Sequence, residues 1–176
     1  MPHLIVIYGA PHTGKTSLAR EVARGLGDKS AVVSVDALLD DAIRLHDRDA
    51  HAELEMVYTQ VRLLVANYLK NRYHVVLEGA FTHDRDGMLQ SREQEIDQTL
   101  GLMRNLAPSP LTVRLTASAE TLRRRALDPE RSPGIETVIR IDEAYRTRYG
   151  GRALQLSTDE RSLAQLAAEI HSRLQG

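Results

Sequence analysis

The chain has 176 residues, 42% of them hydrophobic, and its 23 basic and 24 acidic residues give a formal net charge of −1. This size suits one folded domain with a substantial core, and the balanced charge does not favour nonspecific nucleic-acid binding. No cysteine is present, which excludes disulfides, thiolate catalysis and cysteine-ligated zinc. The apolar run at 4–8 is too short for a signal peptide, and no stretch reaches the roughly 20 apolar residues of a membrane span, so we expect a cytoplasmic protein.

Short apolar runs alternate with longer segments of helical periodicity, which is typical of βαβ units around a parallel sheet. Neither a repeat nor a linker divides the chain, so an α/β protein with a single domain over residues 1–176 is predicted. The predicted strands are 4–8, 31–35, 74–77, 111–115 and 153–156. The predicted helices follow the first strand to about residue 26 and then cover 37–45, 54–68, 93–106, 118–125, 138–145 and 157–174.

Capping and turn residues refine these boundaries. Ser118 is a favourable N-cap for the helix behind it, and Ser157 with Glu160 three residues later predicts a capping box before the last helix. Proline and glycine within 128–134 predict a loop. Residues 80–92 are polar and are predicted to be irregular.

The most specific motif follows the first predicted strand and opens the first predicted helix. It matches the phosphate-binding loop pattern G-x-x-x-x-G-K-[ST] through Gly9, Ala10, Pro11, His12, Thr13, Gly14, Lys15 and Thr16. Backbone N–H groups of such a loop converge on phosphate oxygens, and the helix N-terminus adds a favourable dipole. We expect Lys15 to reach the β- and γ-phosphates, Thr16 to ligate Mg²⁺ and Ser17 to complete the nucleotide site. A glycine turn that matches by chance is the competing interpretation.

Two acidic residues stand at predicted strand ends, where open α/β sheets line their ligand crevice. Asp36 could accept a proton from a substrate hydroxyl or hold magnesium through water, while its structural alternative is an N-cap for the helix from Ala37. Glu78 could be the acid that works with magnesium in many P-loop proteins, or it could hydrogen-bond the substrate. A solvated strand end is its structural alternative.

Arginines flank and enter a predicted lid at 126–134. Arg123, Arg124 and Arg125 precede it, and Arg131 lies within it. A planar guanidinium suits the charge that spreads over three oxygens during phosphoryl transfer. We predict that Arg125 and Arg131 are catalytic and that Arg124 contacts the nucleotide, whereas a solvated helix face is the alternative for the triplet.

Polar residues just past Glu78 lie where an acceptor could bind. His83 and Arg85 are predicted to contact the acceptor, with Asp84 and Arg92 as further candidates and a plain polar loop as the alternative. No NKxD motif is present to bind guanine, which favours ATP over GTP.

Together these motifs resemble the small P-loop kinases, and within them the zeta-toxin and chloramphenicol phosphotransferase group. Residues 35–40 resemble the segment of the phosphotransferases that carries the catalytic aspartate. Residues 75–79 resemble the Glu-Gly-Thr segment of zeta toxins, whose glutamate contacts the acceptor sugar, although Ala80 replaces the threonine here. The resemblance covers about residues 4–172.

This resemblance implies a five-stranded parallel sheet in the order 2-3-1-4-5 flanked by helices, the P-loop nucleoside-triphosphate hydrolase fold. It also implies a mobile lid near 126–134 and the use of ATP with Mg²⁺. Adenine is expected to pack between the first lid arginines and the loop at 157–159.

The leading interpretation is a kinase that transfers the γ-phosphoryl group of ATP to a hydroxyl of a small polar molecule. Antibiotics, sugars, nucleosides and nucleotide-sugars are all open as acceptors, with their site expected in 37–60 and 80–100. One alternative is a polynucleotide 5′-kinase, for which the composition offers no basic channel, and another is a nucleotide-binding regulatory ATPase, for which no switch segment is found. A small molecule is therefore the expected partner, membranes and nucleic acids are not, and a homodimer stays open.

Overall fold

A computed structural model gives the fold for residues 1–39, 51–85, 88–126, 134–148 and 153–175. Its centre is a parallel sheet of five strands in the order β2-β3-β1-β6-β7. The strands are β1 (Leu4–Tyr8), β2 (Ser30–Ser34), β3 (His74–Gly79), β6 (Leu111–Thr116) and β7 (Leu154–Ser157). This arrangement confirms the predicted fold class and strand order.

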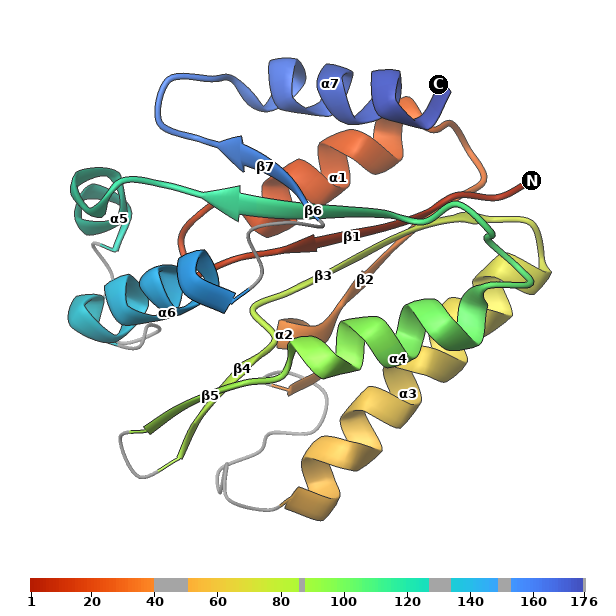
Figure 1. Ribbon diagram of the computed structural model, residues 1–176. Helices are drawn as coiled ribbons and strands as arrows, with labels where there is room; N and C mark the ends of the chain where they lie inside the picture. The colour runs from red at the N-terminus through yellow and green to blue at the C-terminus, as the bar shows by residue number, and fades with distance from the viewer. Residues whose placement is uncertain (40–50, 86–87, 127–133, 149–152, 176) are drawn as a thin grey trace.

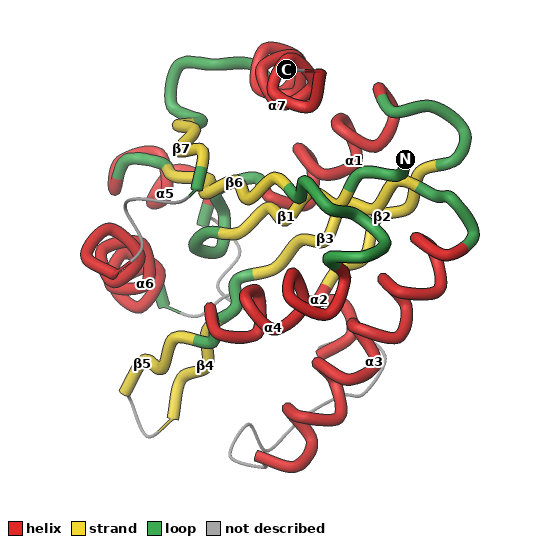
Figure 2. Tube along the Cα trace, turned by 45° about the vertical axis from the view of Figure 1, so that its right-hand side comes forward, coloured by secondary structure: helices red, strands yellow, loops and turns green. Residues whose placement is uncertain are grey.

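Helices cover both faces of the sheet (Figures 1 and 2). One face carries α1 (Lys15–Gly25) and α7 (Leu163–Gln175), which pack side by side. The other face carries α3 (His51–Lys70) and α4 (Glu93–Met103). The remaining helices, α5 (Ala119–Arg125) and α6 (Ile135–Arg148), lie near the carboxyl ends of the strands. None of the described helices is long and apolar enough to cross a membrane.

The central strand β1 shows how the sequence builds two cores. Its five residues are all buried, and successive side chains of a strand point to opposite faces. Val6 and Tyr8 join the core beneath α3, α4 and α6, while Ile5 and Ile7 join the core beneath α1 and α7. A continuous apolar run was therefore the correct signal for a strand buried on both sides.

The prediction that 80–92 is irregular was wrong. Residues Thr82–Arg85 and Met88–Ser91 form β4 and β5, an antiparallel pair that projects from the sheet (Figure 1). Its base is closed by the Arg92 N–H, which donates to the Phe81 carbonyl at 2.8 Å. Backbone pairing stabilises this hairpin without the apolar alternation that reveals a strand in a sequence.

Two boundary predictions were also wrong. Strand β2 ends at Ser34, and Asp36 lies in the short helix α2 (Val35–Ala37), which Ser34 caps by accepting a hydrogen bond from Ala37 N at 3.2 Å. The last helix begins at Leu163 rather than after Ser157, because Ser157 belongs to β7. Its capping partners are Ser162 and Gln165 instead.

One capping prediction was confirmed, and two other predictions extend beyond the described residues. Ser118 does cap α5, accepting a hydrogen bond from Thr121 N at 3.2 Å. The predicted helix 37–45 is described only as far as residue 39. Most of the lid at 126–134, with Arg131, lies outside the described residues.

Candidate active site

The phosphate-binding loop runs from the end of β1 to the start of α1, at the carboxyl edge of the sheet (Figure 1). A side chain at Gly9 would come within 2.2 Å of the Leu115 carbonyl oxygen on β6, so only glycine fits where the loop leaves the sheet. His12 has a φ of 65°, a left-handed conformation that is uncommon outside glycine. Thr13 is fully buried, and its hydroxyl donates to the Ala10 carbonyl at 2.8 Å. These contacts hold the loop in one shape before any ligand binds.

Lys15 lies under this loop as the first residue of α1. It is only 6% exposed, and its ammonium group donates to the Ala10 carbonyl at 3.2 Å. The same nitrogen lies 3.7 Å from Asp36 Oδ2, although the two residues come from different elements. The structure therefore brings together the lysine expected at the phosphates and the aspartate expected to be the base.

Asp36 is held from the other side by the chain after β3. The Ala80 N–H donates to Asp36 Oδ1 at 3.1 Å. This contact depends on Gly79, because a Cβ there would lie 2.8 Å from the Cβ of Val35. The alternative that Asp36 caps a helix from Ala37 was wrong, because Asp36 lies inside α2, which Ser34 caps, and its carboxylate instead contacts Lys15 and Ala80.

Thr16 and Glu78 form a second contact below the loop. The Thr16 hydroxyl donates to Glu78 Oε1 at 3.1 Å. Glu78 pairs with Ile7 in the sheet and so points to the α1 face, whereas its neighbour Leu77 points to the α3 face. Glu78 is thus on the same side of the sheet as the first turn of α1.

Glu78 is fully buried, and its Oε2 atom has no hydrogen-bond partner among the described residues. Burial raises the pKa of this carboxyl, and the nearby Asp36 raises it further. Lys15 and the hydroxyls of Ser34 and Thr16 act in the opposite direction without cancelling the effect. A buried carboxylate with an unfilled oxygen is suited to a cationic or hydrogen-donating ligand.

The donor set fits a hard divalent cation such as Mg²⁺. The first-turn hydroxyl of Thr16 and the orphaned oxygen of Glu78 are oxygen donors, and Mg²⁺ takes oxygen ligands, with waters and substrate phosphates filling its shell. No group of three or more His, Asp or Glu residues with metal-binding geometry occurs in the described part of the chain. The protein would therefore share such an ion with phosphate and water.

Arg125, the last residue of α5, joins the loop to the end of β7. One guanidinium nitrogen donates to the His12 and Thr13 carbonyls at 3.3 and 3.4 Å and to the Thr158 hydroxyl at 2.9 Å. The other donates to the Thr158 carbonyl at 3.0 Å. Arg124 and Arg125 are both exposed residues of α5.

Asp159 strengthens the same corner of the site. It accepts hydrogen bonds from the Ser118 N–H at 2.9 Å and from the Ser157 hydroxyl at 3.0 Å. Burial works to raise the pKa of Asp159, but the bonds from Ser118, Thr121 and Ser157 outweigh it and lower the pKa to about 2. The loop at 157–159 is therefore fixed against both α5 and the phosphate-binding loop.

The remaining predicted site residues are Ser17, His83 and Arg85. Ser17 is exposed on α1. His83 and Arg85 lie on β4, and their side chains fall outside the described part of the structure.

Sequence reasoning missed one partner in this site, because Ala80 holds Asp36 through its backbone N–H, which no residue-type pattern reveals. Thr158 belongs to the loop at 157–159 that was expected beside adenine, and it holds Arg125 through both its hydroxyl and its carbonyl. The only signal for Ala80 was its place directly after Glu78 and Gly79.

Comparison with known proteins agrees with this geometry. The chain matches the family AAA_33, described as an AAA domain, over residues 4–138, and it belongs to that family. A search of curated proteins found no match.

Solved structures resemble the whole chain. A candidate kinase from Chloroflexus aurantiacus has a TM-score of 0.66 at 21% identity, with 97% of each chain covered. A shikimate kinase from Acinetobacter baumannii, in complex with shikimate, has a TM-score of 0.63 at 16% identity and covers 99% of this chain and 93% of its own. The APS kinase of Mycobacterium tuberculosis, in complex with AMPPNP and APS, has a TM-score of 0.64 at 16% identity with full coverage of both chains. At such identities these likenesses show the P-loop fold.

Proposed function

We propose that the protein is an ATP-dependent kinase that phosphorylates a hydroxyl group of a small polar molecule, with residues 1–176 acting as one kinase domain. The observation that carries this proposal is the 3.7 Å contact between Lys15 Nζ and Asp36 Oδ2. A lysine at that place in a phosphate-binding loop faces the β- and γ-phosphates. A carboxylate beside it is suited to receive the proton of an attacking hydroxyl.

The proposed reaction is an in-line transfer. The acceptor oxygen forms a bond to the γ-phosphorus while the bond from that phosphorus to the β–γ bridging oxygen breaks, and ADP leaves. Asp36 takes the hydroxyl proton, and the Ala80 N–H orients its carboxylate through Oδ1. Lys15 and the backbone N–H groups of the loop balance the charge of the phosphates.

Glu78 is assigned to the nucleotide side of this reaction. It shares the α1 face with Thr16, whereas Asp36 contacts Ala80, directly after the carboxyl end of β3. Mg²⁺ bound there would neutralise phosphate charge. Thr16 would offer its hydroxyl to the ion, and Glu78 would orient the water around it.

The likeness to kinases of small molecules supports this proposal, as does the resemblance to the zeta-toxin and chloramphenicol phosphotransferase group. The neighbouring solved structures include proteins named for shikimate, APS and gluconate as substrates. Arg125 holds the phosphate-binding loop against Thr158, and adenine is assigned to this side of the site, beside the loop at 157–159. Arg131 and Arg124 are proposed to reach the nucleotide when it is bound.

The test is an ADP-formation assay with Mg-ATP and a panel of acceptors. Antibiotics, sugars, nucleosides, nucleotide-sugars and hydroxylated acids form the main arm, and a 5′-hydroxyl oligonucleotide and an acceptor-free reaction form two others. Stoichiometric phosphorylation of a small molecule, lost in Lys15→Ala, is the expected result. Phosphorylation of the oligonucleotide alone, or hydrolysis that no acceptor stimulates, would replace the proposal with a polynucleotide kinase or a regulatory ATPase.

A further inference from the structure

Arg92 is a buried cation whose charge is poorly balanced. It lies directly before α4 and is 7% exposed, and its Nε atom has no hydrogen-bond partner among the described residues. Arg92 forms a long ion pair with Glu55 on α3, whose Oε1 lies 4.0 Å from Arg92 Nη1 and whose side chain is 42% exposed. A guanidinium carries five N–H donors, and burying one with unused donors is costly unless a ligand completes the set.

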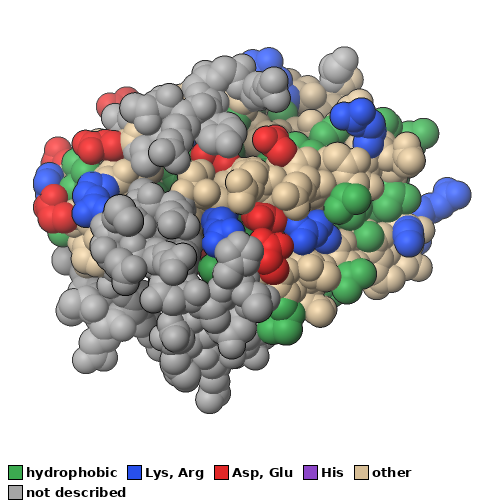
Figure 3. Space-filling view, turned by 60° about the horizontal axis from the view of Figure 1, so that its bottom comes forward, with side chains coloured by type: hydrophobic (Ala, Val, Ile, Leu, Met, Phe, Trp, Pro, Cys, Tyr) green, Lys and Arg blue, Asp and Glu red, His purple; other side chains and the backbone are tan. Residues whose placement is uncertain are grey.

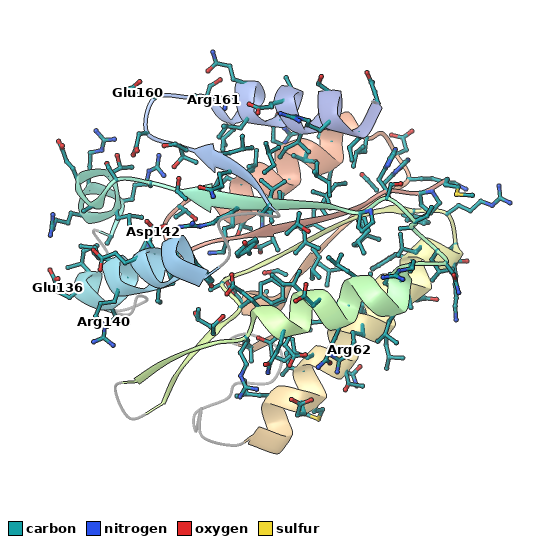
Figure 4. All side chains as sticks on the ribbon, viewed as in Figure 1. Arg62, Glu136, Arg140, Asp142, Glu160 and Arg161 are labelled. Carbon is teal, nitrogen blue, oxygen red and sulfur yellow. The ribbon has the colours of Figure 1, made fainter. Side chains whose placement is uncertain are left out.

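Arg62 provides a comparison, because its guanidinium is hydrogen-bonded to a carboxylate. Arg62 on α3 lies against α4 (Figure 4) and donates to Glu95 Oε2 at 2.8 Å, with further bonds to Gln98 and Thr59. Glu95 is therefore occupied by Arg62. Glu93, the acid next to Arg92 in sequence, accepts a bond from the Ser91 hydroxyl at 2.7 Å.

The backbone places Arg92 beside the proposed base. The Arg92 N–H donates to the Phe81 carbonyl at 2.8 Å, and the Ala80 N–H donates to Asp36 Oδ1 at 3.1 Å. The two charged residues are thus anchored to consecutive residues of one strand-end segment. Tyr58 stacks on Phe81, the residue that anchors Arg92, with 6.2 Å between ring centres.

The electrostatic environment agrees with this placement. Burial raises the pKa of Tyr58, Asp36 adds to the rise, and Arg92 opposes it, so both charges act on the same hydroxyl. Figure 3 brings forward the side of the molecule that carries α3 and α4, and among its described residues basic and acidic side chains adjoin. That pattern suits a small ligand with separate charged and hydroxyl groups.

We propose that Arg92 binds an anionic group, a carboxylate or a phosphate, of the acceptor whose hydroxyl lies at Asp36. The inference rests on the proposed kinase function. It narrows the acceptor to a hydroxylated organic acid or a phosphorylated small molecule, nucleotide-sugars included. Neutral sugars, nucleosides and cationic antibiotics are disfavoured, because they would leave the buried guanidinium uncompensated.

The first test observes Arg92 directly. The protein is loaded with AMPPNP and Mg²⁺ so that the phosphate-binding loop is filled, and its arginine Nε–Hε signals are recorded by ¹⁵N NMR. The signal absent from Arg92→Lys belongs to Arg92. Acetate and inorganic phosphate are then titrated separately, and the inference expects a saturable shift of that signal with the anion that matches the natural group.

The second test measures turnover with paired acceptors: shikimate and its methyl ester, gluconate and glucose, and UDP-N-acetylglucosamine and N-acetylglucosamine. The anionic member should be preferred, and Arg92→Gln should raise its KM about 10- to 100-fold while the KM for ATP stays unchanged. Arg92→Lys should restore part of this loss. Arg104→Gln, an exposed arginine that ends the same helix, is the matched control.

The NMR titration and the turnover assay together distinguish a failure of the anion-site inference from a failure of the kinase proposal. Preference for neutral members, or an unchanged acceptor KM in Arg92→Gln, overturns the inference and leaves the kinase intact. Where no acceptor is phosphorylated, the NMR titration decides: a saturable shift supports the anion site although the kinase proposal fails, and the lack of a shift with both anions overturns the inference.

Discussion

The Thr16 hydroxyl donates to Glu78 Oε1 at 3.1 Å and so joins the first turn of α1 to the end of β3. Both residues lie on the face of the sheet beneath the phosphate-binding loop, and one oxygen of the buried carboxyl has no hydrogen-bond partner in the described part of the chain. This contact supports the proposed assignment of Glu78 to the nucleotide site rather than to the acceptor site, and a single isosteric change can test it.

Glu78→Gln should lower turnover roughly 10- to 100-fold and raise the Mg²⁺ concentration needed for half-maximal rate, because a neutral amide orients metal-bound water less well. Acceptor KM should be unaffected. Glu120→Gln, an exposed acid on α5, is the control. A variant with a raised acceptor KM and an unchanged Mg²⁺ requirement would move Glu78 to the acceptor site.

The raised pKa of Glu78 also predicts that the stability of the protein depends on pH, and the same variant tests this. Burial raises the pKa of Glu78, so the folded state disfavours the ionised carboxyl. Burying the ionised carboxyl lowers the stability of the folded state. This loss of stability is absent below the unfolded-state pKa of about 4.3, grows as the pH rises towards the folded-state pKa, and is complete above it. Glu78→Gln should therefore melt above the wild type at neutral pH and converge with it near pH 4, as measured by thermal unfolding without ligand.

Lys15→Ala should abolish turnover and weaken triphosphate binding, because it removes the charge aimed between the β- and γ-phosphates. Lys29→Ala, which truncates an exposed lysine before β2, should change neither. The measurements are ADP formation and titration with a fluorescent ATP analogue. Wild-type turnover in a folded Lys15→Ala protein would remove the basis of the site.

Asp36→Asn should leave nucleotide binding nearly intact and lower turnover roughly 10²–10⁴-fold, the usual range for a general acid–base group. Asparagine retains the oxygen that accepts from Ala80 N, so the fold around it is kept. Excess Mg²⁺ distinguishes the two roles left open for Asp36: recovery of rate indicates an orienting role towards the ion, and no recovery indicates a base. Unchanged turnover on the true acceptor would end the catalytic assignment.

Arg125→Gln should weaken nucleotide binding more than it slows the bound enzyme. The substitution breaks the link between the phosphate-binding loop and Thr158, which holds the loop in its binding shape. The expected result is a raised Kd for the ATP analogue with a smaller change in kcat. A large fall in kcat at an unchanged Kd would show instead that Arg125 stabilises the transferring phosphoryl group, as the sequence predicted. Arg123→Gln is the control, since that arginine is exposed and lies 3.9 Å from Glu136.

ATP should compete for the site more strongly than GTP. The sequence lacks an NKxD carboxylate for the guanine edge, and the loop at 157–159 is already engaged by Arg125 and Ser118. A competition titration against the fluorescent analogue measures the ratio. GTP binding tighter by about tenfold, equal to about 1.4 kcal/mol, would reverse this prediction.

The sequence by itself determined the phosphate-binding loop and the five strands of the sheet. Both are local features: a glycine-rich turn between a strand and a helix needs only consecutive residues, and a strand buried on both faces is a continuous apolar run. The strand order came from resemblance to a family, because periodicity carries no information on which strands are neighbours.

Only the tertiary structure decided which residues of the site contact one another. Asp36 was expected at a strand end as a base or an indirect magnesium ligand, with a helix cap as the alternative, but the sequence did not show that its partners are Lys15 and the backbone of Ala80, 44 positions away. The hairpin of β4 and β5 gave no apolar alternation in the sequence, and its backbone pairing appears only in the structure. In the sequence, Arg92 was one of several polar residues in a predicted loop. In the structure it stands out because it is buried and its Nε atom has no hydrogen-bond partner among the described residues. Such partnerships depend on which faces pack together across the fold, and local sequence patterns encode the local backbone rather than those distant contacts.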